Sequence, residues 1–101
     1  MKSINDNVND FLDFLRFERL LSSNTITSYK RDLEKFSEFV ISNCINEYLN
    51  ISNKQILSFL EIIFKTHTDT SVSRVLSTLR SFYKFLLTDN RTDKNPFAQI
   101  R

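Results

Sequence analysis

The chain contains no glycine and a single proline, Pro96, among its 101 residues. Glycine supplies the left-handed backbone of tight hairpins and the close backbone approach of phosphate-binding loops. A β-meander, a Walker loop and a dinucleotide fingerprint are therefore excluded, or nearly so. Because 41% of the residues are hydrophobic and 26% are charged, the chain can bury a core. One all-α domain, a compact bundle of helices, is what we expect.

Apolar side chains recur at helical spacing in four segments of the chain. They predict helices over about residues 4–20, 24–43, 52–66 and 71–87. Ser22 or Ser23 can cap the second helix, and Ser52 with Gln55 forms a capping-box pattern at the third. We expect Asn43 to take the left-handed conformation that ends the second helix, where other chains use glycine.

The same pattern predicts how deeply each helix is buried. Phe14, Phe17 and Leu21 widen the apolar face of the first helix, so we expect that helix to be buried on two sides. The third helix is apolar almost all round and should be the most enclosed. The expected core positions of the second and fourth helices are Tyr29, Leu33, Leu76, Leu79, Phe82 and Tyr83.

Several functional classes find no support in the sequence. Cys44 and His67 are each alone, so we expect no disulfide, no metal site and no cofactor. His67 lies in a polar loop, and the acidic pairs lie on solvated helix faces, so no catalytic site is visible. No apolar run approaches the ~18–20 residues that span a bilayer. The N-terminus does not look like a signal peptide, which favours the cytoplasm and no membrane contact.

Positive charge is concentrated toward the C-terminal end of the chain. Residues 1–64 carry seven Lys/Arg against nine Asp/Glu, whereas residues 65–101 carry seven against three. The polar faces of two predicted helices mix cations with short hydroxyl side chains, which let a helix approach a phosphate backbone, donate to its oxygens and neutralise its charge. An ordinary solvated surface rich in Ser and Thr has the same composition. The residues of these faces are Asn24, Thr27, Ser28, Arg31 and Lys35, and Ser73, Arg74, Ser77, Arg80, Ser81 and Lys84.

Two residues of this kind lie at predicted helix starts. Thr25 follows the start of the second helix, and Ser71 stands at the start of the fourth. Free backbone N–H groups and the helix dipole favour a phosphate at such positions.

Two long segments resemble a known family. Residues 11–33 read FLDFLRFERLLSSNTITSYKRDL, and residues 73–86 read SRVLSTLRSFYKFL. These segments resemble the N-terminal core-binding domain of Xer-type tyrosine recombinases and phage integrases, which has the patterns Tyr-x-x-Asp-Leu and Arg-x-Leu-Ser-x-Leu-Arg-x-Phe-Tyr-x-Phe-Leu. The resemblance covers nearly the whole chain, and Asn95-Pro96 fits the point where that domain leads into the catalytic one.

The resemblance implies an orthogonal, SAM-like bundle of four helices that forms one half of a clamp around duplex DNA. In the family, the second and fourth helices face the DNA. Carried over by position, the implied contacts are Asn24, Thr25, Ser28, Arg31, Ser71, Arg74, Ser77 and Ser81, with Thr27, Thr70, Thr78 and Lys84 in second rank. Most would bind phosphate, and Arg31 or Arg74 would reach a base edge. Replacing either arginine with alanine should leave the thermal midpoint nearly unchanged.

The resemblance also implies a division of the chain. Residues 1–95 would form the DNA-binding domain, and residues 96–101 would begin a linker to a catalytic domain that is absent here. The chain would then not be an enzyme by itself. Its partners would be double-stranded DNA, its own catalytic domain and other recombinase protomers. The alternative is a helical protein–protein interaction module, suggested by the apolar surplus of the first helix and by an apolar tail at Phe97 and Ile100.

Overall fold

The computed structural model describes residues 2–98 and 100. Within them the regular elements are α1 (Ile4–Phe17), α2 (Ser23–Ser42), the 3₁₀ helix η1 (Tyr48–Asn50), α3 (Asn53–Thr66) and α4 (Asp69–Thr88). These residues include no strand, so the prediction of an all-α bundle of four helices is confirmed. None of the described helices has both the length and the apolar character needed to cross a membrane.

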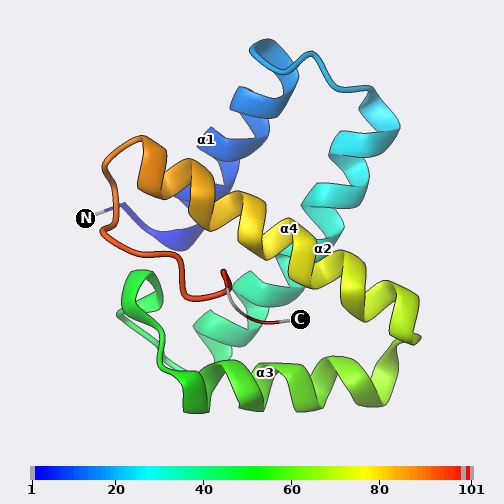
Figure 1. The fold of residues 1–101 in the computed structure, drawn as a ribbon, viewed down its shortest axis with the longest axis vertical. Helices are drawn as coiled ribbons and strands as arrows, with labels where there is room; N and C mark the ends of the chain where they lie inside the picture. Colours follow the sequence, from blue (N-terminus) through cyan, green and yellow to red (C-terminus); the bar gives the residue numbers. More distant parts are fainter. Residues whose placement is uncertain (1, 99, 101) are drawn as a thin grey trace.

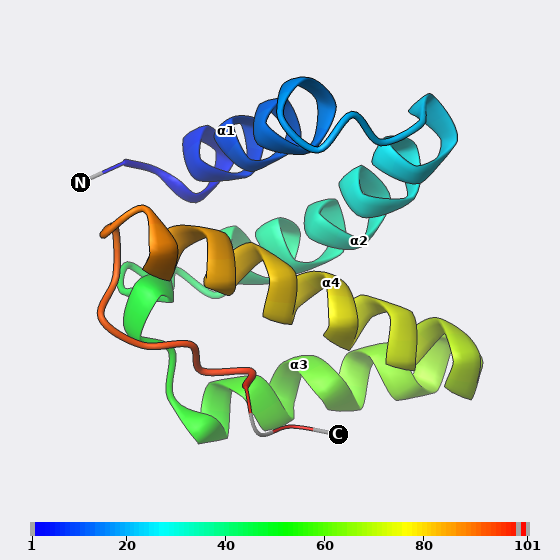
Figure 2. The same ribbon diagram turned by 45° about the horizontal axis from the view of Figure 1, so that its top comes forward.

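Helix α4 is the central element of the bundle. It contacts each of the other three α-helices, and in Figure 1 it runs diagonally across α2, with α1 above and α3 along the bottom of the view. The turned view in Figure 2 likewise places α4 between α1 and α3. In Figure 1, α1 and α2 cross the direction of α4 steeply, whereas α3 runs closer to the direction of α4.

Every α-helix begins at a hydroxyl N-cap. The side chains of Ser3, Ser22, Ser52 and Thr68 each accept a hydrogen bond from the backbone N–H three residues on. The predicted Ser52 capping box is confirmed, because Gln55 Oε1 accepts from the N–H of Ser52 at 3.0 Å. Helix α4 starts two residues earlier than predicted because Thr68 supplies its cap.

Among the described residues, three that are not glycine have the left-handed backbone conformation that glycine usually adopts. Leu20, Cys44 and Asn90 have φ of 53°, 52° and 58°, and they follow the ends of α1, α2 and α4. The prediction that Asn43 takes this conformation is wrong: its φ is −98°, and the left-handed residue is Cys44. Asn43 instead donates from Nδ2 to the carbonyl of Phe39 at 2.8 Å.

An aromatic core lies where α1, α2 and α4 meet. Phe11 of α1 packs edge-on against Phe82 of α4 with ring centroids 5.7 Å apart. Phe36 of α2 packs against Phe59 of α3 at 5.3 Å and against Tyr83 of α4 at 6.2 Å. The predicted core positions are buried, with the exception of the half-buried Tyr29; the buried ones are Leu33, Leu76, Leu79, Phe82 and Tyr83.

The predictions of deep burial fail for α3 and hold in part for α1. Helix α3 is not the most enclosed helix, because Leu57, Ile62 and Phe64 are half or more exposed. Of the residues expected to widen the buried face of α1, Phe14 and Leu21 pack against the core, whereas Phe17 is 69% exposed.

The segment after α4 returns to the core. Phe97 is fully buried and lies 5.7 Å from the ring of Phe36 and 5.5 Å from that of Tyr83. Asn95 Nδ2 donates to the carbonyl of Arg80 at 3.1 Å. In Figure 2 this segment passes between α4 and α3. Phe97 is therefore a core residue. The protein-interaction alternative had counted it as part of an apolar tail, and this is wrong.

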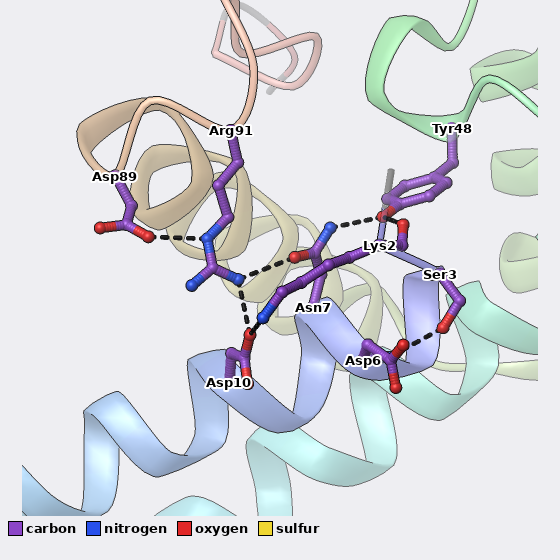
Figure 3. Close-up of polar contacts among 8 residues, drawn as sticks. All are labelled: Lys2, Ser3, Asp6, Asn7, Asp10, Tyr48, Asp89 and Arg91. Carbon is purple, nitrogen blue, oxygen red and sulfur yellow. Dashed lines mark hydrogen bonds and ion pairs between the residues drawn. The ribbon is translucent and has the colours of Figure 1, made fainter.

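A polar cluster joins the turn after α4 to α1 (Figure 3). Arg91 donates from Nη1 to Asp10 Oδ2 at 2.7 Å and to Asn7 Oδ1 at 2.8 Å, and from Nε to Asp89 Oδ2 at 2.7 Å. Lys2 Nζ approaches the same Asp10 oxygen to 2.6 Å. The hydrogen bond from Lys2, and next the one from Arg91, lower the pKa of the Asp10 carboxyl. Ion pairs therefore join the turn after α4 to α1 at this corner of the domain.

Two buried tyrosines extend this corner inward. The hydroxyl of Tyr48 accepts from Asn7 Nδ2 and donates to the carbonyl of Lys2 at 2.8 Å. The hydroxyl of Tyr83 donates to the carbonyl of Tyr48. Burial raises the pKa of both phenols, so both stay protonated as hydrogen-bond donors.

Candidate nucleic-acid interface

The first half of α2 presents a polar face that ends in an arginine. Asn24, Thr27, Ser28 and Arg31 are all exposed and lie three or four residues apart, so they share one side of the helix. The hydroxyl of Thr27 donates to the carbonyl of Ser23 at 2.9 Å, which fixes its orientation. Three of the four side chains are short and end in hydroxyl or amide groups, which can donate hydrogen bonds to a ligand.

Helix α4 presents a second stripe of the same kind. Thr70, Arg74, Ser77, Ser81 and Lys84 follow one another at alternating spacings of four and three residues. All are exposed except Ser81, which is half-buried. The two faces together contain most of the residues that the sequence predicts for DNA contact.

The two helices are joined where they cross by a buried carboxylate. Asp32 of α2 is 0% exposed and accepts two hydrogen bonds from Arg74 of α4, at 3.1 Å from Nε and 2.9 Å from Nη2. Thr78 donates to it at 3.0 Å, and Lys35 Nζ lies 3.7 Å away. The hydrogen bond with Asp32 raises the pKa of Arg74, which keeps the guanidinium charged. We call these four residues the Asp32 cluster.

Thr78 corrects the predicted contact set. Its side chain is buried and its hydroxyl is committed to Asp32, so it is not available on the surface. Position 78 lies at the edge of the apolar face of α4, where that helix meets α2. Only the family resemblance, carried over by position, had placed Thr78 among the DNA contacts.

The predicted anion sites at the helix starts share their donors with the N-caps. The backbone N–H of Thr25 donates to the Ser22 hydroxyl at 3.3 Å, and that of Ser71 donates to the Thr68 hydroxyl at 3.2 Å. Each cap therefore occupies one of the four N–H groups at its helix start that could bind a phosphate. Asp69 in the first turn of α4 further opposes an anion there.

The surface cations differ in how much charge they leave for a ligand. Among residues 2–98 and 100, Arg31 and Lys84 make no ion pair. Arg80 donates a hydrogen bond to the carbonyl of Ile100 in the C-terminal segment. Arg74 shares its charge with Asp32, but its side chain is still 49% exposed. Arg31, Lys84 and the outer edge of Arg74 are thus the cations that a polyanion can reach on these faces.

Asp32 is the residue of this site that the polar-face pattern missed. It lies three residues after Tyr29 and four before Phe36, so its helical position is on the apolar side of α2. A charge at such a position signals a buried partner, and that signal was present in the sequence. The sequence did not reveal which cation would come from α4.

Catalytic chemistry gains no support from the geometry. The ring Nδ1 of His67 lies 2.7 Å from the hydroxyl of its neighbour Thr66. Over the described part of the chain, no group of three or more His, Cys, Asp or Glu side chains is arranged to hold a metal ion.

Comparison with known proteins gives consistent matches. The family model described as phage integrase, N-terminal SAM-like domain, matches residues 8–90. Tyrosine recombinase XerC of Anoxybacillus flavithermus is 36% identical over 97% of this chain and 33% of its own length. Tyrosine recombinase XerD of Rickettsia bellii is 37% identical over 92% of this chain and 30% of its own. The chain thus spans about a third of the length of these curated relatives. No solved structure matches it.

Proposed function

The chain belongs to the family of phage integrase N-terminal SAM-like domains, and from this membership we propose that it is the duplex-DNA-binding module of a site-specific tyrosine recombinase. It binds DNA through the exposed faces of α2 and α4 and carries out no chemistry by itself. Strand cleavage and exchange belong to a separate catalytic domain, and other recombinase protomers are its partners on DNA.

One observation carries the proposal. Two stripes of hydroxyl and cationic side chains lie on helices that cross at the Asp32 cluster, so they are held at a fixed relative position. Hydroxyl groups donate to phosphate oxygens, and Arg and Lys neutralise phosphate charge. The surface residues of this interface are Asn24, Thr27, Ser28, Arg31, Thr70, Arg74, Ser77, Ser81 and Lys84. Thr25 and Ser71 contribute hydroxyls at its border.

A titration of fluorescently labelled duplex tests the proposal. One module forms half of a clamp, so its dissociation constant should fall within or above the ~10⁻⁴–10⁻⁶ M range of non-specific DNA binding. Arg31→Ala and Lys84→Ala should each weaken binding and each lower the slope of log affinity against log salt by ~0.9, the contribution of one phosphate contact.

Lys54→Ala is the matched control. Lys54 is exposed in the first turn of α3, away from both stripes, and its removal makes the same change in net charge. If Lys54→Ala weakened binding as much as Arg31→Ala did, binding would depend on net charge and not on these faces. Absence of binding at low salt and high protein concentration would refute the proposed function.

Exposed apolar side chains at the end of α1, just after it and on α3 suggest protein contact as a second function. Phe17, Leu20, Leu57 and Phe64 are each more than half exposed, and a contact with another protein would bury such side chains. Sedimentation at increasing concentration without DNA tests this reading. Self-association that Phe64→Ser abolishes would support it, and a monomer at all concentrations would favour the DNA-binding module alone.

A further inference from the structure

The Asp32 cluster contains a buried carboxylate that lies next to the surface proposed to bind DNA, which is a polyanion. A carboxylate there repels DNA, and a buried ion pair contributes less to stability than apolar packing of the same volume commonly does. Electrostatic attraction for DNA therefore does not explain the presence of Asp32, and apolar residues at the same crossing could stabilise the fold as well. Its geometry gives a more specific reason.

Asp32 engages one edge of the Arg74 guanidinium and leaves the other open. A guanidinium has five N–H bonds in a rigid plane. Two of them, on Nε and Nη2, donate to the two carboxylate oxygens of Asp32. The three others, on Nη1 and Nη2, make no hydrogen bond to the described part of the chain, and the side chain is 49% exposed. This free edge can bind a phosphate with two parallel hydrogen bonds.

The pair also restricts the motion of Arg74 before any ligand arrives. An arginine on a helix surface samples many rotamers, and fixing such a side chain on binding lowers affinity by about two- to tenfold. Asp32 is itself held by Thr78 at 3.0 Å and by complete burial, so it provides a fixed anchor. Lys35 adds a second cation 3.7 Å from the carboxylate, and the cluster therefore has a net charge of one positive unit.

We propose that Asp32 is a positioning residue, which holds Arg74 with its free guanidinium edge turned toward the DNA phosphate backbone. The inference rests on the proposed function, because Arg74 must meet DNA for its orientation to matter. Asp32 touches no ligand and acts through Arg74. Arg74→Lys should accordingly fail to replace the arginine, because an ammonium keeps the charge but lacks the planar fork.

The experiment compares two variants that each remove one negative charge from α2. Asp32→Asn should weaken binding of labelled duplex about two- to tenfold by freeing Arg74, although charge alone predicts tighter binding. Glu34→Gln, at an exposed position of the same helix, should bind as tightly as the native chain or more tightly. In an Arg74→Ala background, Asp32→Asn should produce no further loss.

A second readout separates positioning from stability. The side-chain Nε–H of Arg74 should be rigid by NMR relaxation in the native chain and mobile in Asp32→Asn. If Asp32→Asn does not fold, Thr78→Val loosens the carboxylate through one hydrogen bond and should give the same two effects at smaller size. If the native chain binds duplex and a folded Asp32→Asn variant binds it equally well, this inference is overturned but the proposed function is not. Native chain that fails to bind duplex overturns the proposed function and this inference with it.

Discussion

Arg31 and Arg74 look alike in the sequence pattern but have different surroundings. Arg31 is exposed and makes no ion pair within residues 2–98 and 100. Arg74 neutralises a carboxylate that has no access to solvent. Helical spacing indicates that both point outward, and it does not reveal that Arg74 reaches across to Asp32, because that contact joins residues 42 positions apart.

The two arginines should therefore differ in their effect on stability, and the expectation from the sequence that neither affects the thermal midpoint is revised for Arg74 because of its pair with Asp32. Arg74→Ala leaves Asp32 with Thr78 and Lys35 as partners and should lower the free energy of unfolding by roughly 1–3 kcal/mol, below the ~3–5 kcal/mol of a fully buried pair because half of the side chain is solvated. Arg31→Ala should change it by less than about 0.5 kcal/mol. Urea unfolding measures both. Equal stability of the two variants would contradict the role of the Asp32 cluster in the fold.

The polar cluster at Asp10 predicts a response to acid. The folded state lowers the pKa of this carboxyl through Lys2 and then Arg91, so folding favours the ionised form. Its contribution to stability is present above the ordinary Asp value of 3.8 and is lost as pH falls through the lower folded value. Because Asp10 is one-third exposed, the contribution should be below about 1 kcal/mol.

Asp10→Asn tests this assignment. The variant should be less stable than the native chain near neutral pH, and the difference should shrink in acid below the folded pKa of Asp10. Urea midpoints of both proteins across this range provide the measurement. A difference that stays constant with pH would mean that the ion pairs of Asp10 contribute nothing.

At the scale of the elements, helix starts were easier to predict than burial. The hydroxyl caps at Ser22 and Ser52 are local signals, because cap and partner lie three residues apart. Burial depends on which neighbours reach a helix. Helix α3 packs one face on the core and leaves the other in solvent, and nothing local to residues 53–66 distinguishes its two apolar faces.

Two phenylalanines on α3 give a matched test of this asymmetry. Phe59 is buried and packs on Phe36 and Phe39, each with ring centroids 5.3 Å away, so Phe59→Ala should cost about 3–5 kcal/mol. Phe64 is 56% exposed, so Phe64→Ala should cost less than about 0.5 kcal/mol. Thermal or urea unfolding measures the stability of the two variants. Similar losses of stability would indicate that the outer face of α3 is covered in solution.

At the scale of the whole molecule, the core includes chain beyond the predicted domain boundary at residue 95. The aromatic ring of Phe97 completes the contact between Phe36 of α2 and Tyr83 of α4. The sequence pattern suggested a linker there because Asn95-Pro96 follows a polar, turn-rich stretch. A single aromatic residue after such a stretch has no periodicity that could show its return to the core.

Phe97→Ala should destabilise the entire domain. Loss of a fully buried ring should lower the free energy of unfolding by about 3–5 kcal/mol. Lys94→Ala, at an exposed position in the same segment, is the control and should have almost no effect. Equal midpoints for the native chain and Phe97→Ala would place residues 96–100 outside the folded unit.

Amide chemical shifts during titration with a short duplex show whether α2 and α4 together form one DNA-binding surface. We predict that the shifts change at Asn24, Ser28 and Arg31 on α2 and at Ser77 and Ser81 on α4, while Leu57 and Phe64 on α3 stay unperturbed. Shifts centred on α3, or confined to only one of the two crossing helices, would contradict the account.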